Sequence, residues 1–541
     1  MKRDLLIGII VFSGIISLLS GFTGCRKSPI EPDPEPQPVP FVRLLEHQSI
    51  QSKILNRSVH YAVLFPKEYE LSSASFPVVY LLHGYGESET GWYKGGNIAY
   101  YIDQLAAETI PMIYVLPEGF NTYYVNKYNG KFPYMNMFVN ELVPTIDSLF
   151  RTIKDAQHRA VMGYSMGGYG AMIMPCKNPD VFKTGAILSM SFRTDPQYVD
   201  EPQNVFDYQW SPVFGGTGTA GAQRLTDYFI TYSPFHFPGT PGNTSLDGIN
   251  LFIDCGDDEE TLTITNDAFH DTLRDLNIRH EYRVRNGGHT WDYWHHALPE
   301  ALRYIGYAVR QLPYPVDPEP VDPGPPIPAD RLVTEQLPAS DIRYTVALPS
   351  GYTGGSASYP LIIVLHDRAP DAPDTKSQRL FALLNTNMAA FKLPESLVVE
   401  IPLQSTLLTS ILLQSILDQV SAKYRTINDR KHTVILGNDL AGKLAWEVMP
   451  DFTASMNSCL LFDASLPLDA SPSGTDITWY LDISDNGINY KSYNAFYGRL
   501  RQADLPYEYR VRQGTPSHDA FLNGLNQACL FIKDHLKNQV L

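Results

Sequence analysis

A serine between glycines, at residues 163–167 (GYSMG), is the feature of this sequence that most clearly indicates chemistry. The β-rich run 159–162 precedes it, and an Ala- and Met-rich stretch of helical character follows it. On a sharp strand–turn–helix connection, the serine hydroxyl stands out at the carboxyl edge of a sheet, and the glycines leave room for the strained turn. We therefore expect Ser165 to act as a nucleophile.

A serine nucleophile needs a general base, and in this arrangement the base follows later in the chain. His289 lies in a glycine-rich segment, 285–291 (RNGGHTW), directly after an expected strand at 281–284. A loop at this place can reach the top of the sheet. His289 is therefore the expected base for Ser165. Four other histidines are less well placed, namely His270, His280, His295 and His296.

The base in turn needs a carboxylate, which is expected between Ser165 and His289 and directly after a strand. Residues 250–256 (NLFIDCG) form such an expected strand. The residue types leave four candidates open. These are Asp257, Asp258, Glu259 and Glu260.

Residues 81–86 (LLHGYG) end another expected strand ahead of the nucleophile. In this arrangement the oxyanion of a tetrahedral intermediate is held by two backbone N–H groups, one after the nucleophile and one from the earlier loop. The expected donors are the N–H groups of Met166 and Tyr85.

The elements that must position these residues follow from the alternation of short apolar runs with amphipathic helical patterns. This alternation predicts an α/β fold, with a mostly parallel sheet flanked by helices. A segment at about 192–246, rich in Gly, Pro and aromatic residues, fits neither pattern and is expected to form a cap over the active site. Strands are expected at 78–82, 113–116, 159–162, 186–189 and 250–254, and helices at 140–150 and 267–276.

The sequence contains two related copies. Residues 61–83 resemble 344–366, residues 150–155 resemble 424–429, and residues 281–285 resemble 508–512. Three collinear matches with shrinking offsets indicate a tandem duplication whose second copy has lost loop residues. Two stretches that alternate proline with acidic residues are expected to be semi-rigid spacers. The expected organisation is a signal peptide (1–24), a linker (25–40), a catalytic domain (41–312), a second linker (313–328) and a degenerate domain (329–541).

The second copy lacks the chemistry of the first. The offsets place Asp439 at the position of Ser165, Pro516 at that of His289 and Gly487 at that of the acid. We therefore expect residues 329–541 to be non-catalytic, with a glycan-binding or scaffold role. A relocated site that uses Asp439 and His518 is the alternative.

The N-terminus has the pattern of an export signal, since Lys2 and Arg3 precede a short apolar run at 5–19. Small residues before Cys25 resemble the bacterial lipobox, which implies cleavage before Cys25 and its acylation. The chain is thus expected to be an exported lipoprotein of a Gram-negative bacterium, periplasmic or on the outer membrane or cell surface. An uncleaved anchor helix is the alternative. A formal net charge of −16 argues against a nucleic-acid partner.

These motifs together resemble carbohydrate esterase family 1 of the α/β-hydrolase superfamily, over most of residues 55–310. The resemblance implies ester hydrolysis through an acyl-serine, with no metal or cofactor. The family spacing after the strand points to Glu259, whereas counting back from the following helix points to Glu260. We favour Glu260, with Asp258 and Glu259 as alternatives.

The resemblance also implies a class of substrate. Feruloyl or acetyl esters on plant hemicellulose are expected, with a generic short-chain acyl esterase or a thioester hydrolase as the alternative. Trp291 and Trp294, beside His289, are candidates for stacking on a substrate ring, although packing in the core explains them equally well.

Overall fold

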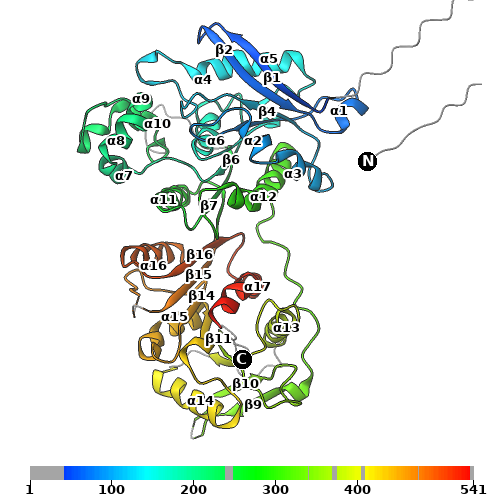
Figure 1. Ribbon diagram of the computed structural model, residues 1–541, viewed down its shortest axis with the longest axis vertical. Coiled ribbons are helices and arrows are strands. Elements are labelled where there is room, and N and C mark those ends of the chain that lie inside the picture. Colours follow the sequence, from blue (N-terminus) through cyan, green and yellow to red (C-terminus); the bar gives the residue numbers. More distant parts are fainter. Residues whose placement is uncertain are drawn as a thin grey trace, which may run out of the picture. The chain divides into compact units, whose positions relative to one another are not determined.

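The computed structural model describes residues 42–237, 246, 248–338, 340–367, 375–403, 408–472, 474 and 476–536 (Figure 1). The expected signal peptide, Cys25 and the first linker lie outside the described residues and stay predictions. From Arg43 onward the chain forms one compact unit. In the described part of the chain, no helix combines the length and the apolar character needed to cross a bilayer.

The strands of the first copy have the spatial order β1-β2-β4-β3-β5-β6-β7-β8. The β1/β2 and β2/β4 pairs are antiparallel, and the other neighbours in this copy are parallel. β3 is apolar and buried along its whole length, as in parallel sheets that helices cover on both faces. The expected fold class is confirmed. The strands are β1 (Leu44–Ser52), β2 (Arg57–Leu64), β3 (Val78–Leu82), β4 (Ile113–Pro117), β5 (Arg159–Tyr164), β6 (Thr184–Leu188), β7 (Asn250–Gly256) and β8 (Glu281–Arg285).

The second copy repeats this order as β9-β10-β12-β11-β13-β14-β15-β16. The register repeats as well, because Leu82 lies beside Gly163 in the first copy and Leu365 lies beside Gly437 in the second. The fold therefore confirms the tandem duplication. The strands are β9 (Leu332–Gln336), β10 (Arg343–Ala347), β11 (Leu361–Asp367), β12 (Leu397–Leu403), β13 (Thr433–Asn438), β14 (Ser458–Phe462), β15 (Thr478–Ser484) and β16 (Tyr507–Arg512).

Helices pack on the sheet as the apolar pattern requires. In the first copy α6 lies against β3, β5 and β6, and α12 packs near α3 in an apolar core that includes Trp92, Ile98 and Leu298. The helix expected at 140–150 is observed as α5, preceded by a wider helical turn at Phe138–Leu142. The first-copy helices are α1 (Glu68–Leu71), α2 (Gly91–Lys94), α3 (Ile98–Gln104), α4 (Tyr134–Met137), α5 (Val143–Leu149), α6 (Met166–Lys177), α7 (Asp195–Asp200), α8 (Gln203–Val205), α9 (Ser211–Phe214), α10 (Asp227–Tyr232), α11 (Thr261–Asp275) and α12 (Trp291–Val309).

The helices of the second copy surround its sheet in the same way (Figure 1). α15 follows β13 where α6 follows β5, and α17 follows β16 where α12 follows β8. The second-copy helices are α13 (Thr375–Ala389), α14 (Ser410–Lys423), α15 (Asp439–Val448), α16 (Tyr490–Gln502) and α17 (His518–His535).

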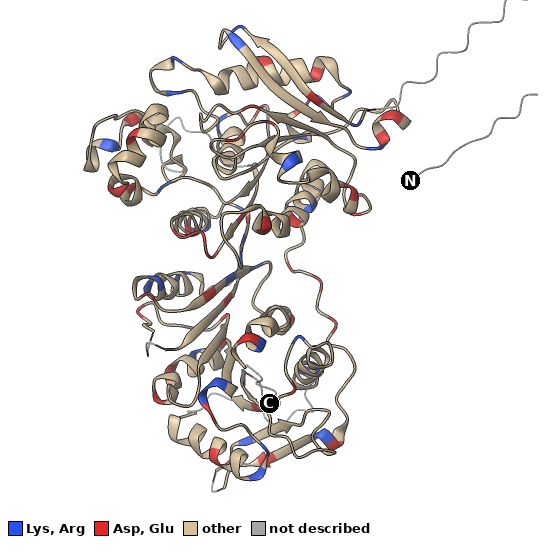
Figure 2. Cartoon of the chain, viewed as in Figure 1, with Lys and Arg blue, Asp and Glu red and all other residues tan. Residues whose placement is uncertain are grey.

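The two sheets meet at β8 and β16. These strands touch antiparallel at Val284 and Val511, and this contact joins the copies into one sixteen-stranded sheet. Figure 2 shows basic and acidic segments close together at this junction. Because the strand contact is short, we expect side chains on either side of it to contribute much of the binding between the two copies.

The described residues 189–237 of the segment between β6 and β7, which is expected to form a cap, contain the short helices α7 to α10. Aromatic rings of this segment stack on one another and on α6, since the ring of Phe192 lies 5.4 Å from that of Phe229 and 4.6 Å from that of Tyr169 on α6. In the sequence, 61 residues separate β6 from β7, but only 15 separate β14 from β15. The loop residues missing from the second copy are therefore mainly those of this insertion.

The linker at 313–328 contains no helix or strand, as its proline content predicts. It is nevertheless bound along the second copy, because Asp317 accepts a hydrogen bond from the N–H of Thr515 (2.8 Å) and Asn523 accepts one from Val321 (2.7 Å). The spacer is therefore docked on residues near α17.

Candidate active site

Ser165 lies at the turn between β5 and α6, as predicted. Its φ of 58° and ψ of −121° are strained for a residue other than glycine. Its N–H donates to Leu188 O (2.9 Å), and its carbonyl accepts from the N–H of Ser191 (3.0 Å). A Cβ at Gly163 would lie 2.0 Å from the carbonyl oxygen of Gly167, so the turn requires glycine there. These contacts hold the seryl hydroxyl at the carboxyl edge of the sheet.

Ser165, His289 and Glu259 form a continuous chain of hydrogen bonds. The Oγ of Ser165 lies 2.9 Å from Nε2 of His289, and Nδ1 of His289 lies 2.7 Å from Oε2 of Glu259. The Glu259 side chain is fully buried, whereas 37% of the His289 side chain is exposed. A carboxylate on Nδ1 fixes the tautomer whose Nε2 can accept the seryl proton. The arrangement can therefore activate Ser165 by general base catalysis.

The favoured acid, Glu260, does not contact His289. Its side chain is exposed, and its carbonyl accepts a hydrogen bond from Nη1 of Arg501 (2.6 Å). Glu260 has a φ of 48° and directly precedes α11, so the extra residue of this loop is accommodated after the acid. Counting back from the helix therefore gave the wrong residue, and counting forward from Gly256 gives the residue in contact, Glu259.

The other two carboxylates of this loop have different places. Asp258 is exposed. Asp257 is buried and accepts hydrogen bonds from the N–H of Gly287 (3.1 Å) and from Nη1 of Arg510 (2.5 Å). Neither is in contact with the imidazole.

Ser189 and Gly256 complete the surroundings of Glu259. Oε1 of Glu259 accepts hydrogen bonds from the hydroxyl of Ser189 (2.5 Å) and from the N–H of Gly256 (2.9 Å). Nε1 of Trp294 in turn donates a hydrogen bond to the Ser189 hydroxyl (2.8 Å). A buried carboxylate is tolerated when both oxygens are hydrogen-bonded. Sequence reasoning missed Ser189, although a serine at the end of an expected strand, beside the nucleophile, was an available signal.

The loop after β3 holds the expected oxyanion donor, Tyr85. Buried His83 accepts the N–H of Gly119 at Nε2 (2.8 Å), so its Nδ1–H donates to the carbonyl of Gly84 (2.8 Å). The Gly84 carbonyl and the Tyr85 N–H belong to one planar peptide and point in opposite directions. Fixing the carbonyl on His83 therefore aims the Tyr85 N–H away from the core.

Met166, the second expected donor, is the first residue of α6. The first N–H groups of a helix have no intrahelical acceptor and carry the positive end of the helix dipole. The structure thus places Tyr85 on the loop after β3 and Met166 at the start of α6, directly after Ser165.

The two tryptophans predicted to bind substrate differ in burial. Trp294 is 4% exposed, and its ring lies 5.0 Å from that of His289. Trp291 packs edge-on against Trp92 (5.5 Å) and Tyr164 (4.5 Å). Both indoles belong to the first turn of α12, which follows His289, and both pack against the apolar core of the first copy. For Trp294 the prediction of substrate stacking is corrected to a packing role behind His289, whereas Trp291 is partly exposed and its stacking role stays a prediction.

An aromatic group that sequence reasoning missed lies beside the oxyanion loop. The ring of Tyr85 lies 6.1 Å from that of Tyr208 and 6.2 Å from that of Tyr123, and Tyr208 is 71% exposed. Burial, together with the neighbouring phenols, raises the pKa of Tyr85 to about 12, so it is neutral in the physiological range. Tyr208 belongs to the irregular insertion, where the sequence carries no periodic signal.

The second copy keeps the shape of the elbow without its nucleophile. Asp439 has a φ of 48° and accepts a hydrogen bond from the Ser465 hydroxyl (2.7 Å). The ring of His518 stacks on that of His366, 5.4 Å away. The alternative site built from Asp439 and His518 is therefore not formed as a bonded pair, and the strand registers keep Gly487 and Pro516 at the acid and base positions.

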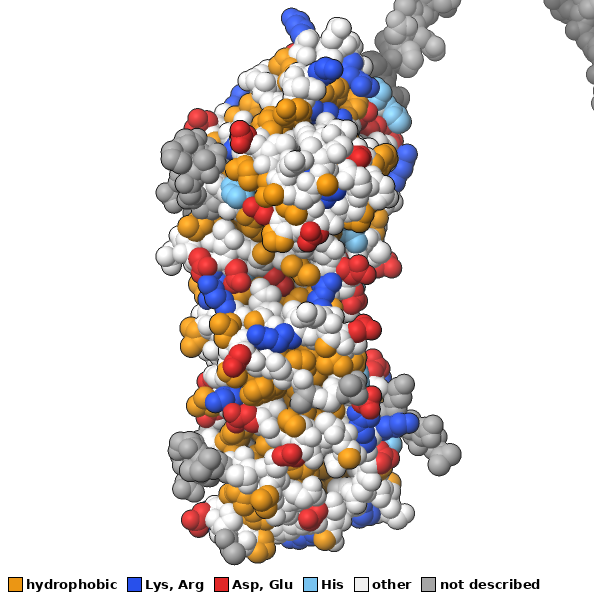
Figure 3. Space-filling view, turned by 90° about the vertical axis from the view of Figure 1, so that its left-hand side faces the viewer, with side chains coloured by type: hydrophobic (Ala, Val, Ile, Leu, Met, Phe, Trp, Pro, Cys, Tyr) orange, Lys and Arg blue, Asp and Glu red, His pale blue; other side chains and the backbone are white. Residues whose placement is uncertain are grey.

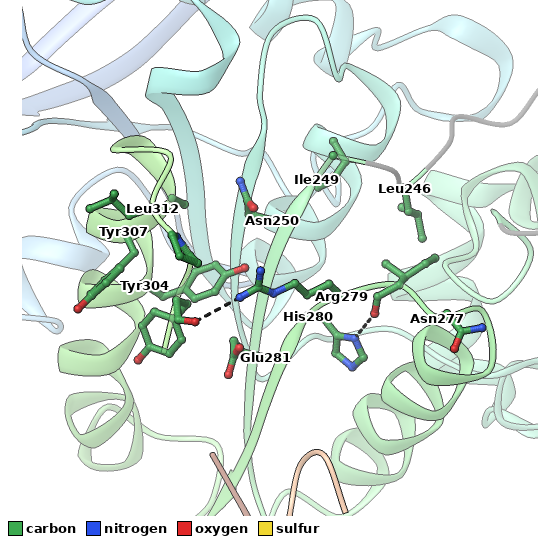
Figure 4. Close-up of a pocket in the computed structure, with 15 residues that line it drawn as sticks. Leu246, Ile249, Asn250, Asn277, Arg279, His280, Glu281, Tyr304, Tyr307 and Leu312 are labelled. Atoms are coloured by element: carbon green, nitrogen blue, oxygen red, sulfur yellow. Dashed lines mark hydrogen bonds between the residues drawn. The ribbon is translucent and has the colours of Figure 1, made fainter. Parts of the chain in front are cut away.

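A cavity of about 330 Å³ lies elsewhere, at the amino ends of β7 and β8 (Figure 4). Asn250 and Glu281, the first residues of these strands, line it together with Arg279 and His280. Nδ1 of His280 lies 2.7 Å from Ile278 O. The triad follows the carboxyl ends of the strands, so this cavity is not where Ser165 acts.

Comparisons with known proteins agree with this geometry. Residues 52–305 match the family model described as "Putative esterase". Over 135 residues, 24% of this chain, the sequence is 33% identical to an endo-1,4-beta-xylanase/feruloyl esterase of Xylanibacter ruminicola, of which it covers 18%. Over 268 residues it is 24% identical to an acetyl esterase of Caldicellulosiruptor saccharolyticus, covering 47% of this chain and 95% of that protein.

A solved structure of a ferulic acid esterase is 28% identical and covers 49% of this chain and 98% of its own, with a TM-score of 0.41. The chain spans less than a fifth of the Xylanibacter relative and about half of a Mycobacterium tuberculosis esterase (52%). The matched region contains the elbow, the acid loop and the base loop. Residues 52–305 have an α/β-hydrolase fold and are similar in sequence to the putative-esterase family and to a xylanase/feruloyl esterase.

Proposed function

We propose that this protein is an exported serine esterase that removes feruloyl or acetyl groups from plant hemicellulose. The observation that carries the enzymatic part is the hydrogen-bonded series Ser165, His289 and Glu259 at the carboxyl edge of the sheet. Its members come from three separate loops, and their distances fit proton transfer from serine to histidine.

The reaction follows from this geometry. Ser165 Oγ attacks the ester carbonyl and passes its proton to Nε2 of His289, while Glu259 stabilises the imidazolium. The N–H groups of Tyr85 and Met166 hold the oxyanion. The C–O bond to the alcohol then breaks, and the alcohol leaves with the proton from His289. Water attacks the acyl-serine by the same steps and releases the acid.

The choice of substrate rests on two supports. Two proteins similar to this chain are a xylanase/feruloyl esterase and an acetyl esterase. The exposed ring of Tyr208, beside Tyr85, offers an aromatic surface to a phenolic acyl group. A generic short-chain acyl esterase or a thioester hydrolase is the alternative, and the same triad would serve it.

We also propose that the mature chain is a lipoprotein acylated at Cys25, periplasmic or on the outer membrane or cell surface. The basic, apolar and small-residue pattern of the N-terminus supports this location. Metabolic labelling of the expressed protein with a fatty-acid analogue, lost in Cys25→Ala, tests it.

The substrate proposal is tested with methyl ferulate, acetylated xylan and p-nitrophenyl butyrate on the full chain. Ferulate or acetate should be released from the plant-type esters, and Ser165→Ala should lower kcat by about 10⁴-fold or more. Hydrolysis of the butyrate ester alone would favour the generic esterase. No hydrolysis of any ester would overturn the proposal. Titrating the Ser165→Ala protein with xylan oligomers tests glycan binding.

A further inference from the structure

We propose that the second copy acts as a positioning element for the active site of the first, through a salt bridge between Arg510 and Asp257. The inference rests on the assignment of Glu259 and His289 to the triad and is independent of the substrate. It gives the degenerate copy a role in catalysis without any chemistry of its own.

Asp257 is the point of contact. Its Oδ2 accepts hydrogen bonds from Nη1 of Arg510 (2.5 Å) and from the N–H of Tyr509 (3.0 Å), both on β16. The side chains of Asp257 and Arg510 are 2% and 10% exposed. Burial opposes the charge on Asp257 and raises its pKa, while Arg510 opposes that rise. Both charged groups are thus largely shielded from solvent. Removing Arg510 leaves the buried Asp257 without a cationic partner, whereas Arg510 also pairs with Glu508 on its own strand.

Asp257 is bonded to the base loop as well as to the second copy. Its Oδ1 accepts the N–H of Gly287 (3.1 Å), two residues before His289, and its own N–H donates to Arg285 O (2.9 Å). Asp257 also lies two residues before Glu259. One carboxylate therefore connects β16 to both loops that carry triad members.

A second residue of the second copy holds the far side of the acid loop. Nη1 of Arg501, on α16, donates to the carbonyl of Glu260 (2.6 Å), the residue after Glu259. Glu260 has a φ of 48°, which is strained for glutamate and needs support from its surroundings. Glu259 is thus bracketed by two anchors, both supplied by arginines of the non-catalytic copy.

The interface is reciprocal, which provides an internal control. Nη1 of Arg283 on β8 donates to Oδ2 of Asp485 (2.5 Å), and Asp485 accepts the N–H of Gly514 (3.0 Å). Asp485 follows β15 as Asp257 follows β7, so each copy inserts an equivalent arginine beneath the equivalent loop of the other. This is the pattern of an isologous contact between like units. The loop held by Arg283 carries no triad acid.

The Arg510–Asp257 and Arg283–Asp485 ion pairs are therefore expected to hold the two copies together to a similar degree, but only the first should affect catalysis. On the exposed rim, Lys491 pairs with Asp275 (2.7 Å), and Figure 3 shows acidic and basic side chains next to one another on this side of the molecule. Loss of the Asp485 pair should loosen the interface only. Loss of the Asp257 pair should loosen the interface and also displace the acid and base loops.

The test compares Arg510→Gln, Asp257→Asn and the matched control Asp485→Asn in the full chain, with p-nitrophenyl acetate as substrate. A displacement of about 1 Å in a catalytic group can lower the rate by about 10²-fold. We expect Arg510→Gln and Asp257→Asn to lower kcat by about 10- to 100-fold with KM within about threefold of wild type. Asp485→Asn should lower Tm to a similar degree and keep wild-type kcat.

Two further variants keep the test decisive. Arg510→Lys, which restores the charge, should recover part of kcat, and the double variant Arg510→Gln/Asp257→Asn should lose no more than either single one. Folded Arg510 and Asp257 variants with wild-type kcat would overturn the inference. An equal loss of kcat in Asp485→Asn would also overturn it, because general loosening would then explain the effect. If Arg510→Gln does not fold, the kcat values of Arg510→Lys and Asp257→Asn test the proposal instead.

Failure of the triad assignment gives a different result. In that case Ser165→Ala, Glu259→Gln or both would keep wild-type activity, regardless of the activity of Arg510→Gln. If both of these variants are inactive and Arg510→Gln is fully active, the triad stands and only the role of the second copy is wrong.

Discussion

Oε2 of Glu259 lies 2.7 Å from Nδ1 of His289, while the carbonyl of the next residue, Glu260, is bonded to Arg501. Glu259→Gln keeps the shape of the side chain but cannot stabilise the imidazolium. We expect it to lower kcat for p-nitrophenyl acetate by about 10³- to 10⁴-fold, as loss of the acid does in other triads.

Glu260→Gln is the matched control, since it makes the same chemical change one residue later on an exposed side chain. Its kcat should stay within about threefold of wild type, because isolated exposed charges contribute little. A larger loss of kcat in Glu260→Gln than in Glu259→Gln would show that the acid was assigned wrongly.

His83 fixes the peptide that carries the Tyr85 N–H. Burial lowers the pKa of His83 to about 4, so it stays neutral from pH 5 to 8 and keeps one N–H for the Gly84 carbonyl. His83→Ala should free this peptide and lower kcat by roughly 10- to 100-fold, somewhat less than deletion of an oxyanion donor.

The counterpart of His83 in the second copy, His366, serves as control. It is equally buried, and its Nδ1 lies 2.8 Å from Oε1 of Glu400. His366→Ala should lower Tm without lowering kcat. A wild-type kcat in folded His83→Ala would show that the loop is held by other contacts.

Tyr208 is expected to favour aromatic acyl groups, because its exposed ring lies beside Tyr85. Tyr208→Ala should lower kcat/KM for methyl ferulate by about tenfold, because an aromatic pair contributes about 0.5–1.5 kcal/mol in addition to its buried area. Hydrolysis of p-nitrophenyl acetate should change little. Tyr208→Phe, which keeps the ring, should behave as wild type, and equal losses on both esters would contradict the prediction.

Asp267, on α11, makes stability depend on pH. Its carboxylate accepts from the hydroxyls of Tyr282 (2.6 Å) and of Tyr490 in the second copy (2.9 Å), and burial raises its pKa to about 7. The folded protein therefore holds this proton to higher pH than the unfolded chain. The contribution to the free energy of unfolding is complete at low pH, falls between about pH 4 and pH 7, and is constant above.

Asp267→Asn removes this titration, so Tm should decline less than in wild type between pH 5 and pH 8. Asp275→Asn, an exposed carboxylate on the same helix, should keep the wild-type decline. Parallel Tm profiles for wild type and Asp267→Asn would contradict the prediction.

Local patterns were sufficient to predict the strands, the elbow and the base. Ser165 and His289 each stand in a short segment whose glycines and neighbouring strand are visible without any tertiary contact. The acid was placed among four residues, but the favoured one, Glu260, was wrong, because the backbone conformation of Glu260 decides which side chain turns inward.

Contacts between distant segments could not be predicted in this way. Trp294 looked available for substrate, but the direction in which α12 enters the core buries it. Arg510 is 253 residues from Asp257, and only the pairing of β8 with β16 brings the two together. The sequence did indicate the duplication, yet not that the copies share an interface.

Covalent fusion gives the β8–β16 contact a thermodynamic property that two separate subunits lack. The partner of the esterase domain is always present at the high effective concentration set by the linker, so association becomes an intramolecular step. The linker, docked through Asp317 and Val321, shortens the distance over which the copies can separate. Dilution, which dissociates a dimer and would release Asp257, therefore leaves this pairing intact.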